Sequence, residues 1–96
     1  MPELLDAAAL AAGRRGLQWR HAGNQLLREL TFADFAEAMR FVNAVAEVAE
    51  AAGHHPDMTI SWNRVGLALS THSAGGLTQL DLDLARAIDA LVEAAG

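Results

Sequence analysis

Apolar positions recur with the three-to-four-residue period of an amphipathic helix in three parts of the chain. The first part, residues 2–12, is short and stops before a glycine-bounded break. The second follows Thr31 and Asp34, which have the spacing of a capping box, and runs to about Ala52. It ends at Gly53, a residue suited to closing a helix. The third begins where Thr78 and Asp81 have the spacing of a capping pair. We therefore expect three helices.

Between these helices the period changes to the two-residue alternation of strands. The alternating segments are residues 17–22, 25–30, 58–62 and 65–71. Gly23-Asn24 and Asn63-Arg64 are each interpreted as a two-residue hairpin turn between neighbouring strands. The predicted fold is α+β in the order α-ββ-α-ββ-α, a four-stranded antiparallel sheet with helices packed on one face. One such domain accounts for residues 1–96.

The predicted central helix carries more apolar surface than one face packed on a sheet requires. One strip consists of Phe32, Phe35, Met39, Val42, Ala46 and Ala49. Phe41, Val45 and Val48 form a second strip beside it. Two interpretations of the second strip stay open: it widens the core face, or it contacts another subunit. On the second interpretation we expect a homodimer or a homotetramer.

Composition narrows the class of protein. Hydrophobic residues make up 52% of the 96-residue chain, which argues against disorder. The formal net charge is −5 and the seven basic residues are scattered arginines, so we expect no direct nucleic-acid binding. No apolar run approaches the ~20 residues of a membrane span, so no membrane association is expected. The chain has no cysteine, which excludes disulfides and thiolate chemistry, and we expect a cytoplasmic protein.

Three of the four histidines, His54, His55 and His72, are the candidate catalytic groups of the chain. An imidazole has an ordinary pKa of about 6.5 and therefore exchanges protons near neutral pH. If Asn63-Arg64 is the turn, the hairpin register places His55 directly opposite His72, with Cβ atoms ~5 Å apart. In an extended backbone His54 points away from His55 and reaches the same place only if the loop bends. A slip of one residue would move His72 to the other face of the sheet.

A zinc site is the main competing use of three histidines. Adjacent histidines diverge in an extended chain, and the sequence has neither a His-x-x-x-His pair nor a cysteine ligand. It also lacks a nucleophile elbow and a phosphate-binding loop. We therefore expect no metal site among these residues.

The histidines belong to a longer pattern with a distinctive spacing. The pattern consists of Glu50, His54, His55, Pro56, Trp62, His72 and Asp81, with Gly76-Leu77-Thr78 ahead of the aspartate. It resembles the signature of the pterin-4a-carbinolamine dehydratase family at every position. The resemblance covers roughly residues 17–92.

The resemblance implies a hydro-lyase that removes water from a 4a-hydroxytetrahydropterin to give the quinonoid dihydropterin. This reaction recycles the tetrahydrobiopterin cofactor of aromatic amino acid hydroxylases. Dehydration involves no net redox change, so no metal, nicotinamide or flavin cofactor is expected and the pterin is the substrate. On the pairing argument His55 and His72 form the acid–base pair, a role typically worth about 10²–10⁴-fold. The further candidates are His54 as a third pocket histidine, Glu50 and Asp81 as supporting carboxylates, and Trp62 as a ring lining a pterin slot.

Two other functions stay open. Some members of the family act as dimerisation cofactors of a homeodomain transcription factor through a helical surface, whereas a complete histidine set argues for retained catalysis. The same pocket could also bind a pterin in molybdopterin metabolism, and the sequence does not separate that function from the dehydratase.

Overall fold

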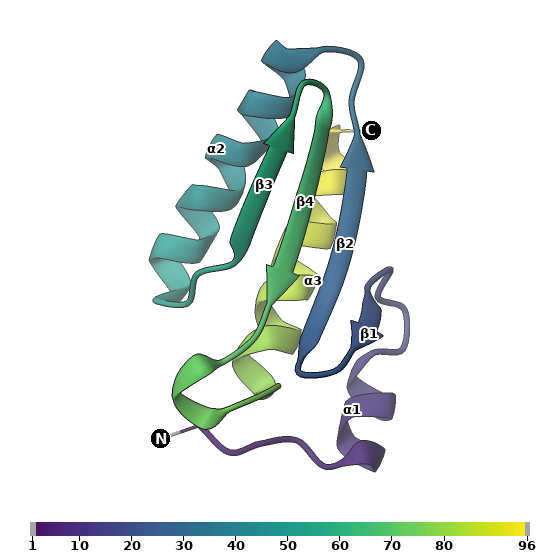
Figure 1. Ribbon diagram of the computed structural model, residues 1–96, viewed down its shortest axis with the longest axis vertical. Coiled ribbons are helices and arrows are strands. Elements are labelled where there is room, and N and C mark those ends of the chain that lie inside the picture. The colour runs from purple at the N-terminus through teal and green to yellow at the C-terminus, as the bar shows by residue number, and fades with distance from the viewer. Residues whose placement is uncertain (1, 96) are drawn as a thin grey trace.

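The computed structural model describes residues 2–95 and confirms the predicted α+β architecture (Figure 1). In chain order the elements are α1 (Ala7–Gly13), β1 (Arg20–Ala22), β2 (Gln25–Thr31), α2 (Phe35–Ala52), β3 (Asp57–Ser61), β4 (Arg64–Leu69), the 3-10 turn η1 (His72–Ala74) and α3 (Gln79–Ala95). The strands form one antiparallel sheet in the order β1-β2-β4-β3. Both long helices, α2 and α3, lie on the same side of this sheet.

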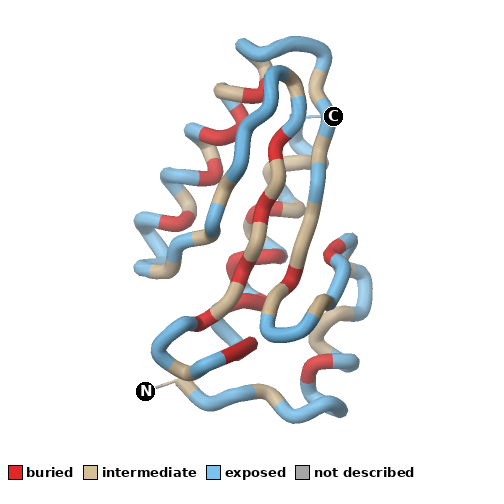
Figure 2. The backbone as a smooth tube through the Cα atoms, viewed as in Figure 1, coloured by how far each residue is buried: buried red, intermediate tan, exposed pale blue. Residues whose placement is uncertain are grey.

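The core lies between the sheet and the two long helices. Because a strand points alternate side chains to opposite faces, β4 buries Val65, Leu67 and Leu69, each with at most 3% exposed. Val45 of α2 and Ile88 of α3 are fully buried members of the same cluster. Figure 2 shows buried positions recurring along these elements, with exposed positions on their outer sides. The interior is thus mainly apolar, and a buried charged side chain within it needs a specific explanation.

The first helix is shorter than predicted. The Asp6 carboxylate accepts a hydrogen bond from the Ala9 N–H at 2.7 Å, so α1 begins at Ala7 and not at residue 2. The residues before this cap pair elsewhere, since the Leu5 N–H donates to the Leu77 carbonyl at 2.9 Å. The N-terminal segment therefore pairs with the residues that directly precede α3, and it does not extend α1.

The central helix begins and ends at residues with clear capping roles. The Asp34 carboxylate accepts from the Glu37 N–H at 2.8 Å, and the Glu37 carboxylate accepts from the Ala33 N–H at 3.1 Å. This reciprocal arrangement satisfies two backbone donors at the start of α2. At the other end, Gly53 adopts the left-handed conformation with φ 64° and closes the helix as predicted.

The core face of α2 combines both predicted strips, since Val42 and Ala49 of the first strip are buried beside Phe41 and Val45 of the second. Phe41 is 5% exposed and Val45 is fully buried, so the interpretation of these residues as a subunit contact is wrong. Phe35, which was assigned to the first strip, is 51% exposed, and Ala46 is exposed as well. The core face is wide, as the first interpretation expected, because α2 packs against both α3 and β4 and not against the sheet alone.

The β3–β4 hairpin turns one residue earlier than predicted. Ile60 pairs with Val65, and Trp62 and Asn63 form the turn, with Trp62 at φ 53°. The Asn63 side-chain amide donates to the Phe32 carbonyl at 2.8 Å, and the Asn63 carbonyl accepts from the Phe32 N–H at 2.8 Å. These two bonds hold Asn63 in the turn and shift the pairing by two residues. A shift of two keeps each side chain on its predicted face, so the apolar pattern alone could not reveal it.

The β1–β2 hairpin has the predicted register, with Ala22 opposite Gln25, but β1 begins at Arg20 and not at residue 17. The carboxylate of Asp89 in α3 holds this hairpin through two contacts. The indole N–H of the buried Trp19 donates to Asp89 at 2.7 Å, and the Arg28 side chain binds the same carboxylate. This contact fixes the β1–β2 hairpin against the last helix.

Candidate active site

A buried histidine–carboxylate pair joins two segments that are far apart in the sequence. His54 follows the cap of α2, and Asp81 lies in the first turn of α3. The His54 Nε2 and Asp81 Oδ1 atoms are 2.7 Å apart. The Asp81 side chain is fully buried and the His54 side chain is 11% exposed. Since a buried carboxylate is costly without partners, this pair differs in kind from a surface contact.

Two further donors hold the second oxygen of Asp81. Oδ2 accepts from the Thr71 hydroxyl at 2.8 Å and from the Thr78 backbone N–H at 2.9 Å. The Thr78 hydroxyl accepts from the Leu80 N–H at 3.2 Å, which completes the capping pair predicted for α3. The N-terminus of a helix also favours a negative charge at this position. Asp81 Oδ2 therefore accepts two hydrogen bonds at a position that favours the carboxylate form.

This network determines which nitrogen of His54 carries the hydrogen. An ionised carboxylate can only accept, so His54 donates its Nε2–H to Asp81 Oδ1. Nδ1 is then the ring nitrogen left for a substrate. In the neutral ring Nδ1 holds a lone pair and can take up a proton. His54 thus has the arrangement of an oriented base.

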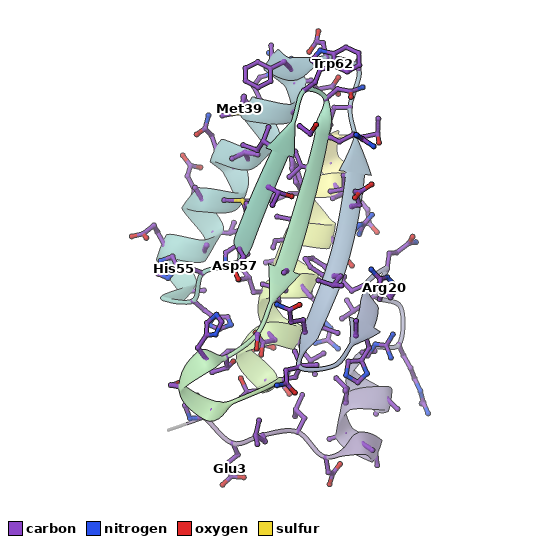
Figure 3. The ribbon with its side chains drawn as sticks, in the orientation of Figure 1. Glu3, Arg20, Met39, His55, Asp57 and Trp62 are labelled. Carbon is purple, nitrogen blue, oxygen red and sulfur yellow. The ribbon has the colours of Figure 1, made fainter. Side chains whose placement is uncertain are left out.

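His55 forms a second pair of opposite character. Its Nε2 lies 2.7 Å from Oε1 of Glu50, which is in the last turn of α2. The two side chains are 60% and 78% exposed, respectively. Figure 3 shows His55 at the end of α2, close to the start of β3 at Asp57. A surface pair of this kind contributes little to stability and leaves the ring open to proton exchange with solvent.

The predicted cross-strand pairing of His55 with His72 is wrong. β3 begins at Asp57 and β4 ends at Leu69, so neither histidine lies in the hairpin ladder. His72 opens η1, is exposed, and borders a cavity of about 340 Å³. The cavity is also lined by Ala22, Asn24, Gln25, Ser70 and Gly75. The prediction was wrong for two reasons. The predicted register of the hairpin was off by two residues, and both strands end before they reach the histidines.

Trp62 also lies away from its predicted place. It is 67% exposed in the β3–β4 turn, at the end of the hairpin opposite to His55 (Figure 3). A strand of five residues such as β3 spans about 16 Å. Within one chain the indole ring therefore does not line the histidine site.

Sequence reasoning missed the hydroxyl contacts around Asp81. Thr71 is 4% exposed and Thr78 is fully buried, and their hydroxyl oxygens are 2.8 Å apart. The spacing of Thr78 and Asp81 signalled a helix cap, whereas no pattern in the sequence marked Thr71. Only the path of the chain after β4 brings Thr71 to this carboxylate.

The two histidine–carboxylate pairs favour proton-transfer chemistry. One pair is buried and oriented, and the other is exposed.

Within residues 2–95, no three histidine, cysteine, aspartate or glutamate side chains gather closely enough to hold a metal ion. None of the helices described has the length and apolar character needed to cross a membrane.

A family model and the sequences of several relatives match most of this chain. The family model for pterin 4 alpha carbinolamine dehydratase matches residues 3–91. A relative from Thermosynechococcus vestitus is 47% identical over 92 residues, which cover 95% of this chain and 97% of the relative. A relative from Acidobacterium capsulatum is 57% identical over 74 residues, which cover 77% of this chain and 80% of the relative. Both relatives carry the family's name.

Solved structures show the same fold. The crystal structure of a transcriptional coactivator/pterin dehydratase from Brucella melitensis is 34% identical, with a TM-score of 0.86 over 96% of this chain and 98% of that one. A pterin dehydratase-like protein described as a RuBisCO assembly factor in the alpha-carboxysome is 21% identical, with a TM-score of 0.63 over 82% and 92% of the two chains. By sequence match and by fold, the chain belongs to the pterin 4 alpha carbinolamine dehydratase family.

Proposed function

We propose that this protein is a dehydratase that converts a 4a-hydroxytetrahydropterin to the quinonoid dihydropterin, in the recycling of tetrahydrobiopterin. The observation that carries the proposal is the contact between His54 Nε2 and the buried Asp81 carboxylate. It supplies one oriented imidazole with a free Nδ1, which is what proton abstraction from a ring nitrogen requires. Membership of the family supports the choice of a pterin as substrate.

The reaction has a simple proton balance. The hydroxyl on C4a takes up one proton and leaves as water, and N5 gives up one proton as the C4a=N5 double bond forms. No electrons are gained or lost, so an acid and a base are sufficient. Each such group typically contributes about 10²–10⁴-fold to the rate.

Each histidine has a separate role in this proposal. Nδ1 of His54 accepts the N5 proton, and Asp81 stabilises the imidazolium that results. His55 protonates the leaving hydroxyl, because its exposed ring pairs with Glu50 and exchanges protons with solvent. His72 is assigned to contact the substrate because it belongs to the family motif; the cavity that it borders is lined by neither His54 nor His55. This assignment replaces the His55–His72 pair inferred from the hairpin.

A dehydration assay on a synthetic 4a-hydroxytetrahydropterin tests the proposal. We expect the wild type to exceed the uncatalysed rate, and His54→Ala, His55→Ala and His72→Ala each to lower it strongly. His21→Ala is the matched control, since His21 lies outside the motif and its ring bonds the Gly23 carbonyl at 2.8 Å. A wild-type rate equal to the uncatalysed rate would reject the dehydratase.

A second candidate function is binding of another protein. Phe35, Ile60 and Trp62 are large apolar side chains that are 51%, 41% and 67% exposed, so they are available to contact a partner. The name of the Brucella melitensis relative couples coactivation with pterin dehydration. If Trp62→Ser leaves the dehydration rate unchanged while it weakens association with a partner, the two functions occupy separate surfaces. A Trp62→Ser variant that loses catalysis would contradict that separation.

A further inference from the structure

We infer that Thr71 is a positioning residue for catalysis: its hydroxyl orients the Asp81 carboxylate toward His54, and its backbone anchors the turn that carries His72. The inference rests on the proposed function for its kinetic consequences, whereas the orientation of His54 can be measured independently of activity. No feature of the sequence pattern pointed to this residue.

The hydrogen bonds around Thr71 have a determined direction. The Leu80 N–H can only donate, so the Thr78 hydroxyl accepts from it at 3.2 Å. The single hydrogen of the Thr71 hydroxyl goes to Asp81 Oδ2 at 2.8 Å. The 2.8 Å contact between the two hydroxyls is therefore a donation from Thr78 to Thr71. The chain of donors runs from Leu80 through Thr78 and Thr71 to the carboxylate.

The directions of these hydrogen bonds determine which oxygen of the Asp81 carboxylate faces His54. Oδ2 is occupied by the Thr71 hydroxyl and by the Thr78 N–H, which leaves Oδ1 for His54. Asp81 is fully buried and Thr71 is 4% exposed, so water does not readily replace a lost donor. Without the Thr71 hydroxyl, Oδ2 keeps only the Thr78 N–H as a donor, so the rotation of the carboxylate is less constrained.

The backbone of the same residue closes the His72 turn. The Thr71 N–H donates to the Gly76 carbonyl at 2.9 Å. The Thr71 carbonyl accepts from the N–H groups of Ala74 and Gly75, both at 3.0 Å. His72 is the next residue in the chain and opens this turn. One residue thus links the turn that carries His72 to the carboxylate that orients His54.

Thr71→Val is the decisive variant, because it removes the hydroxyl and keeps the branched shape of the side chain. We expect kcat to fall about tenfold or more with KM nearly unchanged, since a misplaced base loses part of its usual contribution of about 10²–10⁴-fold. Thr71→Ser retains the hydroxyl and should keep a kcat close to that of the wild type. Thr59→Val makes the same change on the exposed strand β3 and should leave kcat unchanged.

The ring N–H signal of His54 in a proton NMR spectrum tests the orientation directly. The Nε2–H bonded to a buried carboxylate should be protected from exchange and visible in the wild type and in Thr71→Ser. It should broaden or disappear in Thr71→Val, and His54→Ala assigns it. If the wild type had no dehydratase activity, this signal would still test the positioning role.

Three results would overturn the inference. One is a Thr71→Val protein with the wild-type kcat and His54 signal. Another is an equal loss in Thr71→Val and Thr71→Ser, which would assign the effect to packing of the methyl group. The third is an equal loss in Thr59→Val. If Thr71→Val does not fold, Thr71→Ser decides: a retained signal and rate support the role of the hydroxyl, and their loss in a folded protein rejects it.

Discussion

Asp81 is a charged side chain in an apolar interior, and its three donors account for its presence there. His54, Thr71 and the Thr78 backbone together satisfy both carboxylate oxygens. A carboxylate beside an imidazole selects the tautomer of the ring, and an amide in its place selects the other one. The chemistry available at His54 therefore depends on Asp81, a residue that is itself fully buried.

Asp81→Asn tests whether the carboxylate selects the tautomer of His54. The amide oxygen would keep the bonds to Thr71 and Thr78, and the NH₂ group would then face His54. Nε2 would become the acceptor, the ring hydrogen would move to Nδ1, and the lone pair for the substrate would be lost. We expect kcat to fall by about 10²-fold or more. Asp83→Asn, an exposed carboxylate on the same helix, should have no such effect, and a wild-type kcat in Asp81→Asn would disprove the assignment.

At the scale of elements, the ends of helices place the proposed catalytic groups. Gly53 ends α2 in the left-handed conformation, and the very next residue is His54. Asp81 sits in the first turn of α3, where Thr78 provides a reciprocal cap. The site thus lies where a helix C-terminus meets a helix N-terminus, at one end of the sheet.

Gly53→Ala tests the role of the helix end. A Cβ at φ 64° costs about 1–2 kcal/mol, although no neighbouring atom lies within 4 Å of it. We expect a loss of that order in urea unfolding and a lower kcat, because relief of the strain would move His54. Gly16→Ala is the matched control, since it combines φ 81° with open surroundings away from the site. It should lose stability and keep kcat, and equal kcat values for both variants would contradict the placement argument.

At the scale of the whole molecule, the apolar surface left available to another subunit differs from the predicted one. Phe41 and Val45 stabilise the chain itself, so they cannot also form a contact between subunits. The large apolar side chains that stay exposed include Phe35, Ile60 and Trp62. A homodimer or homotetramer therefore remains a prediction, with these residues as its candidate contacts.

Val45→Glu distinguishes a core position from a contact position. The side chain is fully buried, and an unpaired charge there is strongly destabilising. We expect the variant to unfold, as seen by loss of a cooperative thermal transition. Ala46→Glu, one residue along on the exposed side, should fold normally. A folded Val45→Glu protein with altered sedimentation would restore the subunit interpretation.

Sedimentation velocity at micromolar concentration tests the oligomer itself. We expect a species larger than the monomer in the wild type and a shift toward the monomer in Trp62→Ser, because the indole ring is 67% exposed. A single monomeric species in the wild type would reject self-association at these concentrations.

The sequence by itself determined the local features of this protein. The order of helices and strands, the Thr78–Asp81 cap, the Gly53 helix end and the family motif all follow from residues close together in the chain, and each was confirmed. The bounds of the first helix and the first strand were not, since α1 begins at Ala7 and β1 at Arg20. Local spacing has this power because caps, turns and amphipathic faces depend on neighbours within a few residues.

The tertiary structure alone decided the register of the β3–β4 hairpin and the environment of each histidine. Two registers that differ by two residues bury the same faces, and a contact from Asn63 to Phe32, thirty-one positions away, selects between them. Likewise His54 is buried against Asp81 while the adjacent His55 is exposed beside Glu50. These outcomes depend on partners distant in the chain, whose meeting is set by packing of the whole fold and not by spacing along it.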